Sequence, residues 1–470
     1  MFNTFLWVLI TSLLCQRVIC DELNLSSTWE NVNLNRIIDL SRSYTREKLQ
    51  ITVKNIGNKP SSIYYLAYPN EIISKTALIT ASLGDSQFID AALVKDTTTL
   101  EDGSIIGYGA VSFPKSVEPG EDFSFEVSIE YNSCGEPYPK HIDIFEEQHL
   151  LFRTGRYPLS AYFTKEFTLK FLGSTSYKEL NEPQDTNLHG TAEDIAYSYG
   201  PFNNIDSYYK NDVIELVYLH NIPLNKVVNL QRDIWVSHWA GSLQFEEYYE
   251  LVNSGAKLNK GFSRLDHMKK QRQTLHGHYR GVIDTVLPSG AFDHYYTDLV
   301  GMVSTYQVND DHFYLKPRYP IYGGWKYNFT IGWTNVLSDF LRTTEEKDTY
   351  ILSVPILNGP PDTTYDNTSV SIYLMEGTVV EEVDVPVPYA SVQIDTKHSY
   401  FDLNKGHVKV TFNFENLVDE LRSGRILVKY RYDSTAFYKK PISIASYIFI
   451  ALISFFTLAH INLNIDNKQK

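Results

Sequence analysis

Histidine is the residue type best placed to bind a metal in this chain, because His276 and His278 lie two positions apart. Imidazoles are common zinc ligands, and His267, His294 or an aspartate could complete such a site. However, the chain lacks the H-E-x-x-H pattern that puts two histidines on one helix face. The surrounding lysines and arginines favour a solvated loop or helix end. We therefore expect no metal site and no cofactor.

Adjacent carboxylates could act as general acid and base, but neighbours on a β-strand point to opposite faces. The sequence also contains neither a G-x-S-x-G nucleophile elbow nor a glycine-rich phosphate loop. Cys134 has no lysine or arginine in the four preceding residues to activate its thiol. We expect no catalytic residue and interpret the carboxylates as solvated charge; the pairs are Glu246-Glu247, Glu345-Glu346 and Glu381-Glu382.

Residues 1–20 are predicted to be a signal peptide. Their apolar centre precedes Val18 and Cys20, small residues at the minus-three and minus-one positions of a cleavage site. A basic n-region is missing, and the alternative is an uncleaved anchor helix, although the apolar core is short for a span. Cleavage after Cys20 would leave Cys134 as the only one of the three cysteines, so no intramolecular disulfide could form.

Three N-x-S/T sequons, at Asn24, Asn328 and Asn367, are predicted glycosylation sites, because a signal peptide delivers the chain to the secretory pathway. A lumenal part of about 420 residues without disulfides must rely on large hydrophobic cores. The net charge of −14 and the pI of about 5.4 predict an acidic surface. Such a surface argues against nucleic acid or anionic lipid as a partner.

A second apolar stretch predicts a membrane span. Residues 442–463 contain no Asp, Glu, Lys or Arg, and about 20 apolar residues cross a bilayer core. Lysines flank the stretch on both sides, so the positive-inside rule does not fix its orientation. A cleaved signal peptide would place the bulk of the chain in the lumen. A buried core helix is the alternative. We expect a transmembrane helix over 441–463 and a cytosolic tail over 464–470.

Alternating apolar and polar residues predict a mainly β fold. Residues 121–131 read EDFSFEVSIEY, in which every second side chain is apolar, as on a half-buried antiparallel strand. Turn sequences such as Glu118-Pro119-Gly120-Glu121 separate strands of this kind. Many short strands and few helical stretches indicate β-sandwiches. The alternation recurs over residues 49–53, 370–374, 408–414 and 426–432.

One sandwich of this length would be oversized, so two lumenal β domains are expected, over residues 21–230 and 231–440. The polar stretch 179–209 is interpreted as a long loop or a linker near the end of the first domain. Helices are expected only over short pieces, residues 237–254 and 262–276. In the second piece Phe262, Leu265 and Met268 follow helical spacing.

The stretch from Pro317 to Trp333, PRYPIYGGWKYNFTIGW, predicts a tight corner that feeds a strand. Prolines cannot donate to a central ladder, paired glycines allow conformations closed to other residues, and tryptophan adds a large apolar area. On the strand 326–333 the aromatic side chains share one face and Asn328 lies on the other. A glycan on Asn328 would then sit in solvent while the aromatic side chains enter the core.

The same stretch resembles the most recognisable segment of the ribophorin I family, subunits of the endoplasmic reticulum oligosaccharyltransferase complex. The matching residues are Pro317, Arg318, Tyr319, Pro320, Ile321, Tyr322, Gly323, Gly324, Trp325 and Lys326. Further segments match in order: Tyr138-Pro139 to Tyr157-Pro158; Val236-Ser237-His238-Trp239, then Gly255-Ala256 and Gly261-Phe262-Ser263-Arg264; and Leu287-Pro288, then Asp293-His294-Tyr295-Tyr296, Asp298, Gly301 and Val303-Ser304-Thr305.

The resemblance implies a non-catalytic accessory subunit in protein N-glycosylation, the en bloc transfer of a glycan from dolichol pyrophosphate to Asn of N-x-S/T sequons in nascent polypeptides. Catalysis and the metal would belong to a polytopic subunit of the complex. Other subunits would be its partners, and nascent polypeptide is a further candidate. The implied location is the endoplasmic reticulum membrane, as a single-pass type I protein. The chain lacks the cytosolic domain of animal members, as fungal members do, so the ribosome-contacting functions of that domain are not carried over.

Two other functions remain open from the residues alone. One is a single-pass type I cargo receptor or adhesion-type binding protein, which would leave the endoplasmic reticulum. Lys468 stands at the minus-three position without a lysine at minus four or minus five, so retention would have to come from assembly. The other is a lumenal hydrolase with an unfamiliar site, which no motif supports. For the corner itself, core packing and docking of a neighbouring subunit both remain open.

Overall fold

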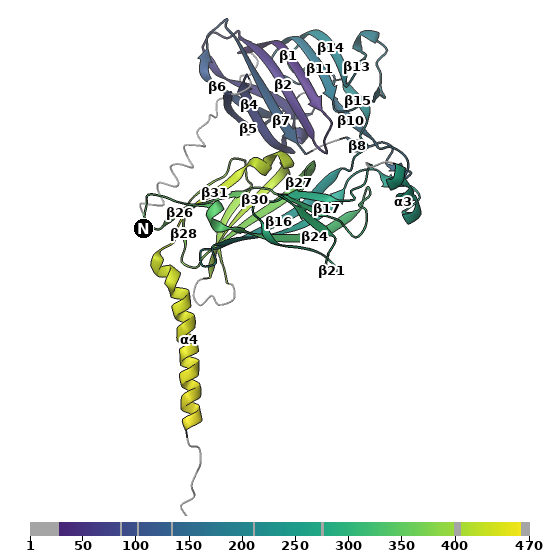
Figure 1. The fold of residues 1–470 in the computed structure, drawn as a ribbon. Helices are drawn as coiled ribbons and strands as arrows, with labels where there is room; N and C mark the ends of the chain where they lie inside the picture. Colours follow the sequence, from purple (N-terminus) through teal and green to yellow (C-terminus); the bar gives the residue numbers. More distant parts are fainter. Residues whose placement is uncertain are drawn as a thin grey trace, which may run out of the picture.

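The structure is a computed structural model that describes residues 28–84, 87–100, 103–132, 135–209, 212–273, 277–398 and 406–461. The predicted mainly β fold is confirmed. Two β regions lie one above the other, and helix α4 (Ser434–His460) extends away from the lower one (Figure 1). The predictions for residues 1–20, Asn24, Cys134, His276 and residues 464–470 fall outside the described residues.

The first β region has a ten-stranded sheet in the order β13-β14-β11-β1-β2-β7-β4-β5-β6-β3 and a four-stranded sheet in the order β12-β15-β10-β8. Its elements are β1 (Trp29–Asp39), β2 (Thr45–Asn55), β3 (Ser61–Pro69), α2 (Asn70–Ile73), β4 (Thr76–Leu83), β5 (Gln87–Thr99), β6 (Ile105–Val117), β7 (Asp122–Tyr131), β8 (Glu136–Pro137), β9 (His141–Ile142), β10 (His149–Gly155), β11 (Thr164–Leu172), β12 (Tyr177–Glu179), η2 (Thr186–Leu188), β13 (Thr191–Glu193), β14 (Ala196–Ile205) and β15 (Val213–Leu219).

The alternating pattern of residues 121–131 explains how this region forms its core. On β7 the side chains of Phe125, Val127 and Ile129 are buried, while the polar residues between them are not fully enclosed. Phe171 of the large sheet meets Phe152 of the small sheet edge to face, with ring centroids 6.2 Å apart. The apolar faces of the two sheets therefore close on one another, which is the layered packing that alternation favours.

Residues 179–209 are not the long loop that the sequence predicted. They include β13 and β14, and β14 pairs with β11 inside the ten-stranded sheet. Tyr199, Phe202 and Ile205 of β14 are buried at intervals of three residues, since the register shifts between Phe167 and Leu169 of β11. An irregular strand of this kind loses the two-residue period that reveals a strand in a sequence.

The second β region is built on an eight-stranded sheet in the order β21-β20-β24-β17-β16-β27-β30-β29, with smaller sheets β25-β26-β31-β28 and β19-β23-β22 beside it. Its elements are β16 (Asn225–Ser237), β17 (Ser242–Asn253), β18 (Lys257–Leu258), α3 (Arg264–Gln273), β19 (Ile283–Val286), β20 (Phe292–Asp298), β21 (Gly301–Met302), β22 (Tyr306–Asn309), β23 (His312–Leu315), β24 (Lys326–Val336), η3 (Leu337–Asp339), β25 (Leu341–Thr343), β26 (Thr349–Pro355), β27 (Thr363–Leu374), β28 (Val379–Asp384), β29 (Ser391–Lys397), β30 (His407–Val418), η4 (Asp419–Ser423) and β31 (Arg425–Arg431).

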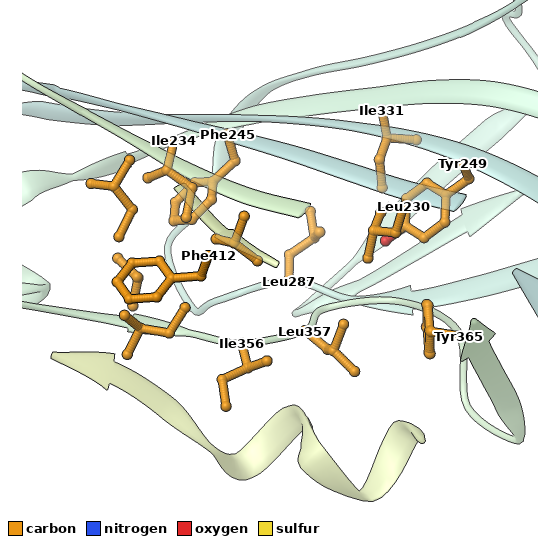
Figure 2. Close-up of a cluster of buried hydrophobic side chains, with 14 of the residues drawn as sticks. Leu230, Ile234, Phe245, Tyr249, Leu287, Ile331, Ile356, Leu357, Tyr365 and Phe412 are labelled. Carbon is orange, nitrogen blue, oxygen red and sulfur yellow. The ribbon is translucent and has the colours of Figure 1, made fainter. Parts of the chain in front are cut away.

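Figure 2 shows the hydrophobic core of this second region. Side chains of β16, β17, β24 and β30 converge there on Leu287, Ile356 and Leu357 from the connections below them. The predicted aromatic face of the strand 326–333 is part of this core, since Tyr327, Phe329, Ile331 and Trp333 are at most 3% exposed.

The predicted helix over residues 237–254 is wrong, because most of this stretch is strand β17. Leu243, Phe245, Tyr249 and Leu251 alternate into the core, and β17 pairs with both β16 and β24. The buried row also contains Glu247, so its apolar period is interrupted in the sequence. The other predicted helix exists as α3.

The two β regions touch along a broad front. Arg46 and Arg42 of the first region pair with Glu420 and Asp419 of the second, and Asn132 donates to Asp366 at 2.8 Å. Most of the buried side chains fall into two clusters, one drawn from residues up to Leu224 and the other from residues from Val227 on, which Tyr44 and Ala77 of the first region join. We propose that these clusters are the cores of the two expected domains, divided near residue 230.

Helix α4 is the one described helix long and apolar enough to cross a membrane. Residues 435–460 have a mean hydropathy of 2.2 in their most apolar window, and none of that window is buried against the β regions. Asp433 caps the helix by accepting a hydrogen bond from the Thr435 amide at 3.1 Å. The apolar helix thus begins directly at the surface of the second β region.

Candidate interaction site around the proline-glycine-tryptophan corner

Residues 317–326, which we call the corner, link β23 to β24. Tyr322 and Gly323 at its centre are buried, whereas Arg318, Tyr319 and Lys326 are exposed and Trp325 is half-buried. Tyr319 donates a hydrogen bond from its hydroxyl to the Lys326 carbonyl at 2.8 Å, which closes the corner on itself. The prolines therefore bracket a segment whose inner side packs and whose outer side faces solvent.

The two glycines allow the corner to lie against the end of β17. A Cβ on Gly323 would come within 2.0 Å of the Ala256 carbonyl oxygen, so only glycine fits there. Gly324 has a φ of +80°, a left-handed conformation that favours glycine. Its amide donates to the Asn253 carbonyl at 2.7 Å, and the Asn253 amide donates to the Trp325 carbonyl at 3.1 Å. The corner and the end of β17 are thereby joined by backbone hydrogen bonds.

Tyr322 is the centre of an aromatic cluster beneath the corner. Its ring centroid lies within 6 Å of the rings of Phe262, His267, Tyr279 and Trp325. The Tyr322 hydroxyl is 2.8 Å from Nδ1 of His267 on α3. Burial raises the pKa of the Tyr322 hydroxyl, so it stays neutral and acts as a hydrogen-bonding group. This cluster holds α3 against the corner.

The corner also lies at the contact between the two β regions. The Ala256 carbonyl lies directly against Gly323. The Ala256 amide donates a hydrogen bond to Oε1 of Gln148, in the first region, at 2.8 Å. The next residues form β18, which pairs in parallel with β9 of the first region. Lys270 of α3 donates from Nζ to the Ile144 carbonyl at 2.5 Å. The corner therefore lies against the contact between the two regions that β9, β18, Gln148 and Lys270 form, which we call the joint.

Arg318 anchors the outer side of the corner. Its guanidinium forms an ion pair with Asp298, whose side chain is only 5% exposed, and donates to the Met302 carbonyl at 3.2 Å. Asp298 also accepts from the amides of Val300 and Gly301. Although burial opposes ionisation, the hydrogen bonds from Arg318 and the two amides hold the pKa of Asp298 below its usual range. The ion pair fixes the β20–β21 turn beside the corner.

The structure brings together most of the segments that carried the family resemblance. Gly255-Ala256, Phe262 and Asp298 all contact the corner, although they come from separate parts of the chain. Tyr138-Pro139 leads into β9, which pairs with β18 next to the corner. Val236 to Trp239 lies elsewhere, where Trp239 contacts the beginning of α4. Four of these segments thus meet at or beside the corner, and a fifth contacts the apolar helix.

The described sequons lie on strands. Asn328 is half-buried on β24 and donates from Nδ2 to the Tyr248 hydroxyl at 2.9 Å. Asn367 is exposed on β27, with only long hydrogen bonds, at 3.4 Å, to Val228 and Asn229. Glycosylation of both remains a prediction, and Asn367 offers the freer amide nitrogen.

The residues considered for catalysis or metal binding do not converge. Among the described residues no group of three or more His, Cys, Asp or Glu could hold a metal ion. His267 and His278 both border Tyr322, but His278 faces Lys270 at 3.3 Å, and His294 packs against Phe313 elsewhere.

One carboxylate interpretation needs correction. Glu246 is exposed, as expected, and contacts Tyr295, but Glu247 points to the opposite face and is fully buried. Its carboxylate forms an ion pair with buried Arg232 at 2.8 Å and accepts from the Tyr249 hydroxyl at 2.5 Å. Burial raises the pKa of Glu247. Both side chains of the ion pair are 0% exposed, so the pair belongs to the core.

Exposed apolar side chains flank the corner on two sides. Leu265 and Met268 of α3, and Phe262 just before it, are exposed, whereas the polar residues His267 and Lys270 of α3 are buried. On the other side, the β20–β21 turn and β21 together carry three apolar residues that are 68–81% exposed. Exposed apolar groups of this kind mark interaction surfaces. We call this set the apolar rim: Phe262, Leu265, Met268, Leu299, Val300 and Met302.

The joint is expected to weaken in mild acid because of His278. Burial, and then the Lys270 charge, lower the pKa of His278 to about 4 from an ordinary value of 6.5. Between pH 6.5 and pH 4 the imidazole of His278 is protonated in the unfolded chain but neutral in the folded chain. The free energy of unfolding therefore falls as the pH drops from about 6.5 to about 4. At pH 5 the loss is about 2 kcal/mol.

The measurement is the urea midpoint of the full chain in detergent at pH 7, 6 and 5. His278→Gln should remove the part of this pH dependence that His278 causes, and it should leave the parts that come from His220 and His238, whose pKa values burial also lowers to about 4. His141→Gln, at an exposed histidine on β9, is the control for the substitution itself. An unchanged pH dependence in His278→Gln would show that His278 does not contribute.

Comparison with known proteins places these features in a family. Residues 29–459 match the family model described as Ribophorin I. Subunit 1B of dolichyl-diphosphooligosaccharide–protein glycosyltransferase from Arabidopsis thaliana is 28% identical, over 93% of this chain and 94% of that protein. Subunit 1 from Schizosaccharomyces pombe is 25% identical, over 95% and 98%. Subunit 1 from Caenorhabditis elegans is 25% identical over 90% of this chain and 70% of its own length.

Proposed function

Because this chain belongs to the ribophorin I family, we propose that it is a non-catalytic subunit of the endoplasmic reticulum oligosaccharyltransferase complex. Its relatives are named as subunit 1 of an enzyme that transfers an oligosaccharide from a dolichyl diphosphate carrier to protein. In this proposal the chain supports the transfer of that glycan to Asn of N-x-S/T sequons in nascent polypeptides. The observation that carries the proposal is a match that spans both β regions and α4.

The proposal assigns catalysis to another subunit. The described carboxylates and histidines considered as acid, base or metal ligand form no group of three that could hold a metal ion, and the fully buried Glu247 is paired with Arg232 within the core. An oxidoreductase, hydrolase or transferase site needs convergent groups around an accessible space. The other subunits would include the polytopic catalytic one, and nascent polypeptide is a candidate for contact with the broad β surface.

The architecture supports an organising role. α4 would anchor the chain in the endoplasmic reticulum membrane, and the two β regions would stand in the lumen as a type I arrangement requires. The joint at the corner keeps these regions in one relative position through β9, β18 and Lys270. The apolar rim beside the joint would be the surface that other subunits cover, because exposed apolar area is removed from water when subunits assemble.

Loss of the chain is expected to lower sequon occupancy on several glycoproteins. An accessory subunit positions or stabilises the enzyme without performing the reaction, so occupancy should fall at poorly used sequons before it falls at efficient ones. The measurement is glycopeptide mass spectrometry of test glycoproteins after depletion of the chain, with re-expression as the control. Unchanged occupancy at every sequon would rule out the accessory role.

Trp325→Ala is expected to separate packing from docking at the corner. Trp325 contacts Phe262, Tyr319 and Tyr322, and its truncation removes a large, half-buried apolar surface. We expect a loss of about 2 to 4 kcal/mol in the free energy of unfolding. Protease resistance and copurification with other subunits are measured together. A folded variant that fails to assemble would show that docking dominates, whereas a degraded variant supports packing.

A further inference from the structure

A cavity of about 620 Å³ lies where α4 leaves the second β region. One wall comes from β16, the turn after it and the turn after β27. The other wall is the first half of α4, which contributes Ile444, Ala445 and Ile448. We call this space the root cavity. It is separate from the corner and from the apolar rim.

A tryptophan joins the two walls at the beginning of α4. Pro441 lacks an amide hydrogen, so the carbonyl of Phe437, four residues earlier in α4, has no helical donor. Trp239 supplies one, because its Nε1 donates to the Phe437 carbonyl at 3.1 Å. The two aromatic rings also stack with centroids 5.2 Å apart. The first turn of the helix is thus fixed to the β region, where Ala436 and Phe437 also pack against the core, and the cavity opens beside it.

The two walls face different solvents. Ile442, Ile448 and Phe449 on α4 are 56–63% exposed at this level, which is the expected exposure of a helix surrounded by hydrocarbon. The β wall adds polar groups and aromatic rings: Trp235, Ser237, Gln244, Glu376, His407 and Tyr432. Lys439 lines the cavity near the boundary between the two environments. An occupant must therefore be polar at one end and apolar at the other.

We propose that the root cavity binds one zwitterionic glycerophospholipid from the leaflet next to the β regions. Lys439 offers a cation to the lipid phosphate, and the Trp235 ring offers a cation–π partner to its ammonium group. One acyl chain lies against Ile444, Ala445 and Ile448. The volume lies within the range of about 300–1,000 Å³ found for small-molecule pockets.

A membrane helix from another subunit fits this space poorly. A helix about 10 Å in diameter fills roughly 400 Å³ per turn, so the cavity would hold only about one and a half turns. That is too short for packing along a span of about 20 residues. A lipid head group with part of one chain matches the size and the polarity of the cavity better.

The test uses the full chain, purified in mild detergent, stripped of lipid and titrated with dioleoyl phosphatidylcholine, with bound lipid counted by native mass spectrometry. We expect saturable binding of one lipid per chain. Ala445→Phe fills the helix wall and Lys439→Glu repels the phosphate, so each should weaken binding at least about tenfold. Ala451→Phe, the same substitution on an exposed position of α4 outside the cavity, is the matched control and should bind as the unmodified chain does.

Two results would overturn the proposal. One is unchanged lipid binding by both Ala445→Phe and Lys439→Glu in samples whose protease resistance matches the unmodified chain. The other comes from a photocrosslinker at position 445 in native membranes. Labelling of another subunit's helix, with no lipid adduct, would show that protein fills the cavity. A lipid adduct at position 445 that is lost in Lys439→Glu would support the proposal.

Discussion

Gly323→Ala is expected to destabilise the second β region and to loosen its joint with the first. The new methyl group would lie 2.0 Å from the Ala256 carbonyl oxygen and 2.5 Å from the Gly255 carbonyl oxygen. Both are backbone atoms of residues whose amides are hydrogen-bonded, to Asn253 and to Gln148, so relief requires the corner to move away from them. Overpacking of this kind costs about 3 kcal/mol. The urea midpoint of the full chain in detergent should fall accordingly, and protease cleavage near residue 256 should increase.

Gly281→Ala provides the matched control for this substitution. It lies in the same region, but its added Cβ would meet only the Tyr279 ring, at 3.3 Å, and that side chain can shift. We expect a change of less than about 1 kcal/mol there. Equal midpoints for Gly323→Ala and the unmodified chain would contradict the close packing of the corner on Ala256.

Arg232→Met is expected to have an effect at least as large, because it leaves Glu247 buried without a positive partner. Both side chains are 0% exposed in the ion pair. Arg232 also donates to the Pro355 carbonyl and to Asn358, so these two acceptors lose a donor at the same time as Glu247 loses its countercharge. Removing one partner of a buried pair costs about 3 to 5 kcal/mol. The free energy of unfolding is measured by urea titration at pH 7.

The double variant Arg232→Met/Glu247→Leu separates the charge from the packing. It removes the orphaned carboxylate, so it should recover most of the loss that Arg232→Met alone produces. Arg425→Met, an exposed arginine on β31, controls for the substitution itself and should change the free energy of unfolding by less than about 0.5 kcal/mol. If Arg232→Met changed the free energy of unfolding as little as Arg425→Met does, the ion pair would not contribute to the stability of the protein.

The parts of the fold that the sequence predicted are those with regular local patterns. Phe125, Val127 and Ile129 alternate without interruption, and so do the aromatic residues of β24, so both strands could be recognised. α4 could be recognised because a long apolar stretch has few other structural solutions. In each case the pattern lies within one element and needs no distant partner.

The failures have a common physical cause, which is that burial depends on distant partners. β17 was predicted to be a helix because Glu247 interrupts its apolar row, and that burial is possible because Arg232 on β16 and the Tyr249 hydroxyl pair with the carboxylate. β14 was mistaken for a loop because a register shift against β11 spaces its buried residues by three. α3 exposes its apolar row because His267 finds Tyr322 inside the fold.

The corner could be predicted from the sequence only in part. Its prolines and glycines predicted a tight turn, and Gly324 indeed has a positive φ. The reason for Gly323 could not be predicted from local chemistry, because the atom that excludes a side chain belongs to Ala256, far earlier in the chain. The ion pair between Arg318 and Asp298 has the same long-range character. Resemblance to a family singled out these residues, and the structure supplies the contacts that explain them.

The measurement that tests membership of the complex most directly is affinity purification of the C-terminally tagged chain from its own membranes in mild detergent, followed by mass spectrometry. We predict recovery of a polytopic oligosaccharyltransferase subunit together with several small membrane proteins. Recovery of the chain alone, or of coat and sorting proteins, would contradict the proposed role and favour a type I cargo receptor.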